Sequence, residues 1–398
     1  MSLANGVQYL AIPGPSVVPD AVLRAMHRPA PNIYEGELHE IVEGLDADLK
    51  AVACTKGHVA TYIANGHGAW EAALANTLSR GDRVLALATG AFAHGWADMA
   101  EAMGVRVDRL DFGRRAAIDL ARVEKALAAD AAHEIRAVIC VQVDTATSVK
   151  NDIAALRATL DRAGHPALLM VDCIACLACD RFEMDAWGVD VMVTGSQKGL
   201  MTPPGLSFVF FNDRADAARE RADLATLYWD WRRRVNPEVF YWRYCGTAPT
   251  HHVYGLRAAL DMIGAEGIEA IWARHATLAR AVWAAAEEWG RAGPLELNIA
   301  DPSIRSTAVT TIRLEAPGGR DLRRWVTDHA GLTLGIGVGM ATLEDPDAAG
   351  IFRIGHMGHV NAQMVMGALG AIDAGLKALS IPHGGSALAA AAAVIAEG

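Results

Sequence analysis

The chain has 398 residues, of which 52% are hydrophobic and 21% are charged, and its formal net charge is −10. This composition excludes a disordered chain and predicts a packed globule, and the length favours two domains. An acidic chain binds nucleic acids and anionic membranes poorly, so we expect neither as a partner. The one compact basic run, Arg232–Arg234, is interpreted as a solvated loop or an interface face.

No segment has the features of a secretion signal or of a membrane span. Residues 1–7 lack a basic stretch followed by an apolar core, and the alanine-rich segment 387–396 is too short to cross a bilayer. Six cysteines in a chain of this length do not form the pattern of a secreted disulfide framework. We therefore expect a cytoplasmic protein.

The first part of the chain alternates strand and helix patterns. Strands are predicted over the apolar segments 59–64, 83–88, 105–110, 135–143, 167–171, 190–193 and 206–211. Helices are predicted over 69–78, 117–129 and 153–163. Because most of these strands are continuously apolar, they predict a mostly parallel sheet with helices on both faces.

The pattern changes after about residue 228. Helices are predicted over 253–263, 268–289, 322–329 and 362–376. Strands are predicted over 307–314, 332–335 and 352–355. These elements predict a smaller unit of mixed α and β structure.

Lys198 follows the predicted strand 190–193 on a turn of small residues, and Asp172 closes the strand before it. A lysine that forms a Schiff base must lose its proton, and a crowded, partly buried position lowers its pKa. An ionised carboxylate would keep the ring nitrogen of pyridoxal phosphate protonated, which makes the ring an electron sink. Taken alone, Lys198 fits a solvated surface lysine equally well, and the surrounding motifs favour the cofactor.

Three further segments follow strand ends, where ligands gather in sheets of this kind. Asn65, Gly66 and His67 form a strand-to-helix turn that could cradle a phosphate. Phe92 could stack on a flat ring, and Thr145 could form a hydrogen bond with a ring substituent. Each segment also has a simpler explanation, namely a common glycine turn, a core aromatic residue and a helix cap.

Arg353 lies within the apolar strand pattern Phe352–Gly355. Its charge cannot be lost, so a buried position requires an anionic partner. This partner could be a substrate carboxylate held by two parallel hydrogen bonds, or it could be a structural Asp or Glu. The pattern leaves both alternatives open.

Cys173, Cys176 and Cys179 have a spacing similar to that of iron–sulfur ligands, but no fourth ligand is evident. Small apolar residues separate them, which favours cysteines packed in a core. Neither His251 with His252 nor the pair at 356 and 359 has the neighbours of a metal site, so we expect no metal.

Together these residues resemble the class V aminotransferases of PLP fold type I, the alanine–glyoxylate, serine–glyoxylate and serine–pyruvate group. The resemblance covers nearly the whole chain and is carried by Pro13–Pro15, Gly66–Leu74, Val171–Asp172, Gly195–Lys198, Pro203–Gly205, Tyr244–Pro249 and Phe352–Gly358. It implies an α/β fold with a mostly parallel, mixed seven-stranded sheet between helices, followed by a smaller α+β domain. Residues 16–255 would form the large domain, and residues 1–15 and 256–398 the small one.

The resemblance implies that the cofactor is pyridoxal 5′-phosphate. Lys198 would form the Schiff base and move the proton, while Asp172 would pair with the pyridine nitrogen. Phe92 would stack on the ring, and Thr145 would approach the ring oxygen. Arg353 would bind the substrate carboxylate.

The resemblance also implies a homodimer with shared active sites. The phosphate would be held by the residues Asn65, Gly66, His67 and Gln197. Tyr244 and Thr247 would reach the phosphate bound in the neighbouring subunit.

The implied reaction is ping-pong transfer of an amino group from a serine-like or alanine-like donor to a 2-oxo acid such as glyoxylate or pyruvate. The segment Asn32–Glu35 departs from the group's pattern at the substrate mouth, so Tyr34 is a candidate substrate contact. Transamination of pyridoxamine with pyruvate stays open, because a relative with that activity has a similar Asp-Thr turn and arginine strand. A non-catalytic iron–sulfur or cofactor-binding protein is the alternative from another class. A cysteine desulfurase is disfavoured because no cysteine follows Cys245.

Overall fold

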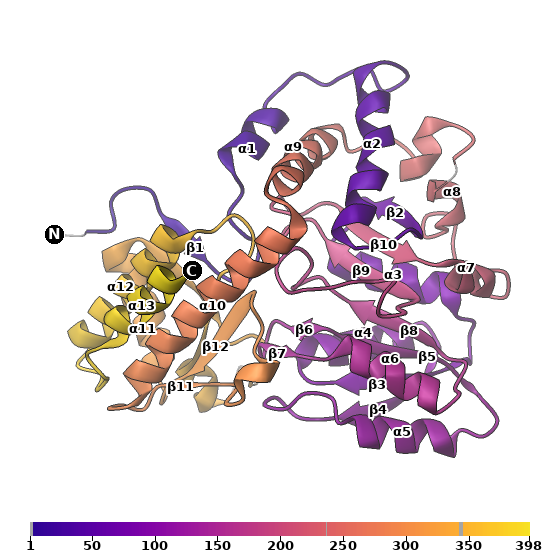
Figure 1. Cartoon of the computed structure of the whole chain (residues 1–398). Helices are drawn as coiled ribbons and strands as arrows, with labels where there is room; N and C mark the ends of the chain where they lie inside the picture. The colour runs from indigo at the N-terminus through magenta and orange to yellow at the C-terminus, as the bar shows by residue number, and fades with distance from the viewer. Residues whose placement is uncertain (1–2, 236, 342–344) are drawn as a thin grey trace.

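The computed structural model describes residues 3–235, 237–341 and 345–398. Its larger part is built on a seven-stranded sheet in the order β2-β10-β9-β8-β5-β3-β4 (Figure 1). β10 runs antiparallel to β9 and β2, whereas the other neighbouring strands are parallel. The strands are β2 (His58–Tyr62), β3 (Arg83–Ala88), β4 (Arg106–Asp111), β5 (Ile135–Val141), β8 (Leu168–Asp172), β9 (Val191–Gly195) and β10 (Ser207–Phe211). The predicted mixed, mostly parallel sheet is confirmed.

Helices cover both faces of this sheet because its strands are apolar on both sides. In β3, Val84 and Ala86 join the core on one face, and Leu85 and Leu87 join the core on the other. The first core includes residues of α3 (Gly66–Thr77), α4 (Ala91–Ala102) and α7 (Asp213–Arg219). The second includes residues of α2 (Glu37–Val52), α5 (Leu120–Ala129) and α6 (Ile153–Arg162).

Some local features differ from the predictions. The helices α1 (Asp20–Met26), α2 and α4 were not predicted, and α3 begins at Gly66, three residues before the predicted start. The predicted strand 135–143 ends at Val141, and Val143–Asp144 (β6) pairs instead with Val149–Lys150 (β7) as a short hairpin. The solvated position expected for the basic run is wrong for Arg234, which is 1% exposed.

The smaller part contains a five-stranded sheet in the order β1-β13-β14-β12-β11. Its strands are β1 (Tyr9–Ala11), β11 (Glu296–Leu297), β12 (Val309–Arg313), β13 (Leu332–Ile336) and β14 (Ile351–Gly355). It shares one core with α10 (Ile268–Gly290), α11 (Gly318–Ala330), α12 (Ala362–Ala378) and α13 (Ala387–Glu397). β1 comes from the start of the chain and lies in the smaller part (Figure 1). It pairs in parallel with β13. The alanine-rich segment forms α13, which packs on α10 and α12.

The predicted domain boundary at residue 255 falls inside α9 (Thr250–Glu266). Beyond that residue, Arg257 still forms a 2.6 Å ion pair with Asp48 of α2, in the larger part. The exact boundary therefore stays a prediction. Within the described ranges, no helix combines the length and the apolar composition that a membrane span requires.

Candidate active site

A cavity of about 270 Å³ lies at the carboxyl ends of β5, β8 and β9. It brings together the predicted residues Asn65, Gly66, His67, Phe92, Thr145, Asp172, Gln197 and Lys198. The N-terminal segment adds Gly14 and Pro15, while Trp70, Ile174 and Pro204 line it without having been predicted. The carboxyl edge of the parallel strands is where α/β sheets bind ligands.

Lys198 lies on the turn that follows β9. The N-terminal segment fixes this turn, because Ser16 N donates to Gln197 O at 2.8 Å and Ser16 Oγ donates to Lys198 O at 2.7 Å. The Nζ atom donates to the carbonyl of Pro13 and lies so close to Gly14 that a Cβ there would overlap it. Burial, and then the charge of Arg353, lower the pKa of Lys198 to about 8. A substantial fraction of the amine is therefore neutral near pH 8.

Asp172 is the buried last residue of β8. Its Oδ2 accepts a 2.8 Å hydrogen bond from Nε1 of Trp70, and its Oδ1 accepts one of 2.6 Å from the backbone N–H of Ile174. Burial raises the pKa of Asp172 to about 7 and outweighs these two hydrogen bonds, which act in the opposite direction. A cationic N–H group in the cavity would restore its ionised form.

The turn at the start of α3 supplies backbone donors. The Oδ1 atom of Asn65 accepts from His67 N at 3.1 Å and from Gly68 N at 3.4 Å, so this side chain caps the helix. The backbone N–H of His67, which was predicted to bind the phosphate, therefore donates to the side chain of Asn65 in this structure. Gly66 packs closely on Ile174, since a Cβ there would displace the end of that side chain.

Gln197 provides a second polar group on this wall. Its Oε1 atom is buried without a hydrogen-bond partner among the described residues. A buried amide with open hydrogen-bonding capacity is uncommon and points to a ligand, and its oxygen and nitrogen can exchange positions by rotation.

Phe92 is placed at the cavity by a helix cap that is remote in sequence. α4 begins after Gly90, which has no side chain to cap it, and Asp144 does so instead. Oδ2 of Asp144 accepts from Phe92 N at 2.9 Å and from Ala93 N at 3.3 Å. The Phe92 ring lies edge-on to Trp70, with centroids 6.4 Å apart.

Arg353 is 7% exposed on β14. Its Nη1 donates to Thr145 O at 2.7 Å and its Nε to Ile336 O at 2.6 Å. No carboxylate of the described chain forms an ion pair with it, so the alternative of a structural Asp or Glu partner receives no support. Burial lowers the pKa of Arg353 to about 10, and the charge of Asp144 acts in the opposite direction.

Four predicted residues are not among those that line this cavity, and the buried Arg353 is one of them. The other three lie farther out or in the core. Tyr34 is 81% exposed, Thr247 is exposed, and Tyr244 is 2% exposed within its own subunit. Tyr244 ends the short 3-10 helix η1 (Phe240–Tyr244) and packs on Phe240 with centroids 6.0 Å apart. The roles of these residues at a neighbouring subunit or at the substrate stay predictions.

The three closely spaced cysteines are fully buried in the core. Cys176 Sγ donates to Gln142 Oε1 at 3.0 Å, and burial raises the pKa of Cys173, Cys176 and Cys179. Across the described residues, no group of three or more metal-binding side chains is arranged around a common point. The structure therefore disfavours the iron–sulfur alternative.

Comparison with known proteins agrees with this site. Residues 9–316 match the family model of aminotransferase class-V. The L-aspartate–glyoxylate aminotransferase of Paracoccus denitrificans is 38% identical over 96% of this chain and 94% of its own length. The serine–glyoxylate aminotransferase of Methylorubrum extorquens is also 38% identical, over 98% of this chain and 97% of its own length.

A solved structure extends the likeness to the fold. The pyridoxamine–pyruvate aminotransferase of Mesorhizobium loti has a TM-score of 0.87 and 25% identity, with 100% of both chains covered. The chain therefore belongs to the class V aminotransferase family and is a transferase of amino groups.

Proposed function

We propose that this aminotransferase moves an amino group from a small amino acid to glyoxylate or pyruvate, with pyridoxal 5′-phosphate as its cofactor. The central observation is that one cavity contains Lys198, with its pKa lowered to about 8, and Asp172, a buried carboxylate that forms no ion pair within the described part of the chain. The relatives named for aspartate–glyoxylate and serine–glyoxylate transfer support glyoxylate as the acceptor.

The residues of the cavity fit this cofactor. Asp172 would bind its protonated ring nitrogen, which supplies the cation that a carboxylate with a raised pKa requires. Gln197, whose Oε1 atom has no hydrogen-bond partner in the described ranges, and the N-terminus of α3 would bind the phosphate. Phe92 would pack on the ring and Lys198 would hold the cofactor covalently. When bound, the cofactor supplies an electron sink for negative charge at the substrate α-carbon.

The chain's own groups then control the proton and the orientation of the substrate. Neutral Lys198 would take the α-carbon proton as a base, and the resulting ammonium group would deliver that proton as an acid to C4′ of the cofactor; a pKa near the working pH suits both roles. Arg353 binds the substrate carboxylate and thereby fixes the direction of the α-carbon–hydrogen bond. Two such half-reactions in succession give ping-pong transfer.

The proposal includes a cytoplasmic homodimer. The segment that carries Tyr244 and the exposed Thr247 also exposes Val239 (44%) and Tyr241 (49%), which a neighbouring subunit would cover. Sedimentation of the purified chain should give a dimer, and Tyr241→Glu should shift it toward the monomer. A wild-type monomer would contradict this part of the proposal.

The decisive experiment is borohydride reduction of the purified protein with added cofactor. Mass spectrometry should find the reduced adduct on Lys198, and Lys198→Ala should form no stable adduct. The amino donor would then be identified from the absorbance change of the cofactor. The donors tested are serine, alanine, aspartate, aminoethylphosphonate and pyridoxamine, each with glyoxylate or pyruvate as the acceptor. No transfer with any amino acid, despite the adduct, would reject the proposed reaction.

A second candidate is transamination of free pyridoxamine with pyruvate. It is supported by the solved relative with that name and a TM-score of 0.87. Pyridoxamine lacks a phosphate, so this reaction would proceed with pyridoxamine and pyruvate alone. Turnover that requires added pyridoxal 5′-phosphate would exclude it.

A further inference from the structure

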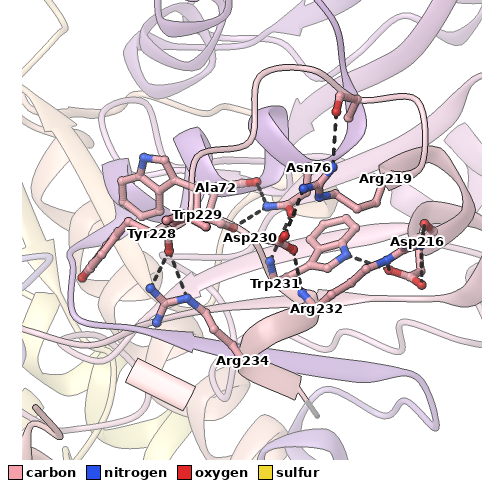
Figure 2. A network of polar contacts seen from close by, with 12 residues as sticks. Ala72, Asn76, Asp216, Arg219, Tyr228, Trp229, Asp230, Trp231, Arg232 and Arg234 are labelled. Carbon is pink, nitrogen blue, oxygen red and sulfur yellow. Dashed lines mark hydrogen bonds and ion pairs between the residues drawn. The ribbon is translucent and has the colours of Figure 1, made fainter. Parts of the chain in front are cut away.

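The residues 228–234 pack against the outer edge of β2 and the side of α3. Figure 2 shows this segment beside Asn76 of α3. β2 is an edge strand, so its outer backbone groups have no strand to pair with. Side chains of the segment 228–234 bind two backbone carbonyls near the end of β2. Arg234 Nη1 donates to Thr61 O at 3.0 Å, and Tyr228 OH donates to Ile63 O at 2.9 Å. These carbonyls lie four and two residues before Asn65, where α3 is capped.

Arg234 is the centre of this arrangement. It belongs to the short helix α8 (Arg232–Val235) and is 1% exposed, and across the described chain no acidic side chain forms an ion pair with it. Instead it donates to the carbonyls of Tyr228, Thr61 and Arg243. Its guanidinium also lies 4.2 Å from the ring centroid of Tyr62 and 4.7 Å from that of Tyr228. A buried charge held only by carbonyls and rings requires those groups at fixed positions.

The same segment is joined to α3 by Asn76. The carbonyl of Trp229 accepts from Asn76 Nδ2 at 2.6 Å and from Tyr62 OH at 2.9 Å. The backbone N–H of Trp231 donates to Asn76 Oδ1 at 3.1 Å (Figure 2). The Trp229 ring also lies against the first turn of α3, since a Cβ at Gly68 would be 3.2 Å from it. β2 and α3 are thus held together on both sides of the turn that connects them.

We propose that Arg234 is a positioning residue for the phosphate of the cofactor. By holding the end of β2 against α3, it keeps the backbone donors at Gly66 and the Asn65 cap in the conformation that receives the phosphate. The inference rests on the proposed function, because that function places the phosphate at this turn. A preorganised site loses affinity when its supporting contacts are removed, even though none of them touches the ligand.

The test compares pyridoxal 5′-phosphate with pyridoxal, which lacks the phosphate. In Arg234→Met, the dissociation constant of the phosphate ester should rise at least about tenfold, the equivalent of one hydrogen bond to a charged group. The dissociation constant of pyridoxal should stay within about twofold of the wild-type value. Pyridoxal has no phosphate, and changes at separate sites usually influence one another by only a few tenths of a kcal/mol. Arg232→Met is the matched control, because Arg232 lies on the same helix but pairs with Asp216 at 3.0 Å and is 42% exposed.

Equal losses of affinity for the two ligands in Arg234→Met would overturn the proposal, because a purely structural defect does not select for the phosphate. If this variant does not fold, Tyr228→Phe removes only the hydroxyl that binds Ile63 O and should still weaken the phosphate ester selectively. If Tyr228→Phe folds and the ratio of its two dissociation constants equals that of the wild type, the proposed role of Arg234 is rejected. A wild-type protein that binds neither ligand would reject the proposed function itself, before any variant is compared.

Discussion

The indole Nε1 of Trp70 donates a 2.8 Å hydrogen bond to Oδ2 of Asp172. This bond joins α3, which carries the turn at Asn65, to the end of β8. Trp70 is 1% exposed and stacks on Trp96 with centroids 6.1 Å apart, so the donor has little freedom to move. The helix that would offer the proposed phosphate site therefore also orients the carboxylate that would bind the ring nitrogen.

Trp70→Phe should raise the pKa of Asp172 further, because the ionised carboxylate loses a donor. Cofactor affinity in the wild type should fall as the pH falls through about 7, the range in which Asp172 takes up a proton. In the variant this fall should occur about one pH unit higher, since a hydrogen bond to a charged group contributes about 1.5–3 kcal/mol and one pKa unit corresponds to about 1.4 kcal/mol. Equilibrium titrations with pyridoxal 5′-phosphate at about ten pH values between roughly 5 and 9 would measure this shift in the pH dependence of affinity.

Trp96→Phe is the control for that experiment. Trp96 stacks on Trp70, but its Nε1 has no partner among the described residues. Its replacement should leave the pH dependence unchanged. A shift of equal size in both variants would show that packing, and not the hydrogen bond, sets the pKa of Asp172.

The rate at which the protein captures the cofactor should rise with pH and level off above about 8, because only neutral Lys198 attacks the aldehyde. Arg353→Gln removes a positive charge that lowers the pKa of Lys198, so the rise should move to higher pH. Stopped-flow absorbance with pyridoxal 5′-phosphate would record both profiles. Superimposable profiles would mean that burial alone lowers the lysine pKa.

Arg353→Lys should weaken the binding of substrates that carry a carboxylate. A single ammonium cannot reproduce two parallel hydrogen bonds, so KM for an amino-acid donor should rise by about tenfold or more. An amine donor of similar size without a carboxylate should show no such change. If KM for both donors rises equally, Arg353 does not bind the carboxylate.

Gly90→Ala should destabilise the fold by about 1–3 kcal/mol, the usual cost of overpacking a buried position. A Cβ at Gly90 would overlap the carboxylate of Asp144 and displace the cap of α4. Urea unfolding would measure this loss. The matched control is Gly367→Ala in α12, where the new methyl group would meet no atom within 4 Å. That variant should gain about 0.5–1 kcal/mol from the better helix propensity of alanine.

Local patterns were sufficient to predict a mostly parallel sheet and the centre of the site, while the mixed, seven-stranded form of the sheet was implied by the family resemblance. Lys198 and Asp172 each follow an apolar strand, and strand ends of a parallel sheet converge at one edge, so their proximity followed from the order of elements. The glycine turn at Gly66 was visible for the same reason. These predictions needed no knowledge of which distant side chains meet.

The features that the sequence did not reveal all depend on contacts between distant residues. Trp70 and Asp172 are 102 positions apart, and the Asp144 that caps α4 is 52 positions from Phe92. α4 was missed because its cap is supplied from elsewhere, and no capping residue precedes it in sequence. The basic run that contains Arg234 was interpreted as a solvated loop or an interface face, because arginine is mostly exposed, while the carbonyl of Thr61 that holds Arg234 lies 173 positions earlier.

The pairing of β1 with β13 has a consequence for how the molecule is assembled during its synthesis. Gly14 and Pro15 line the cavity, and the strand just before them is held by Leu332–Leu334. The ribosome must therefore release more than four-fifths of the polypeptide before this wall can form, since residue 334 of 398 completes the pairing. A nascent chain stalled before that point should contain the large sheet yet fail to retain the cofactor.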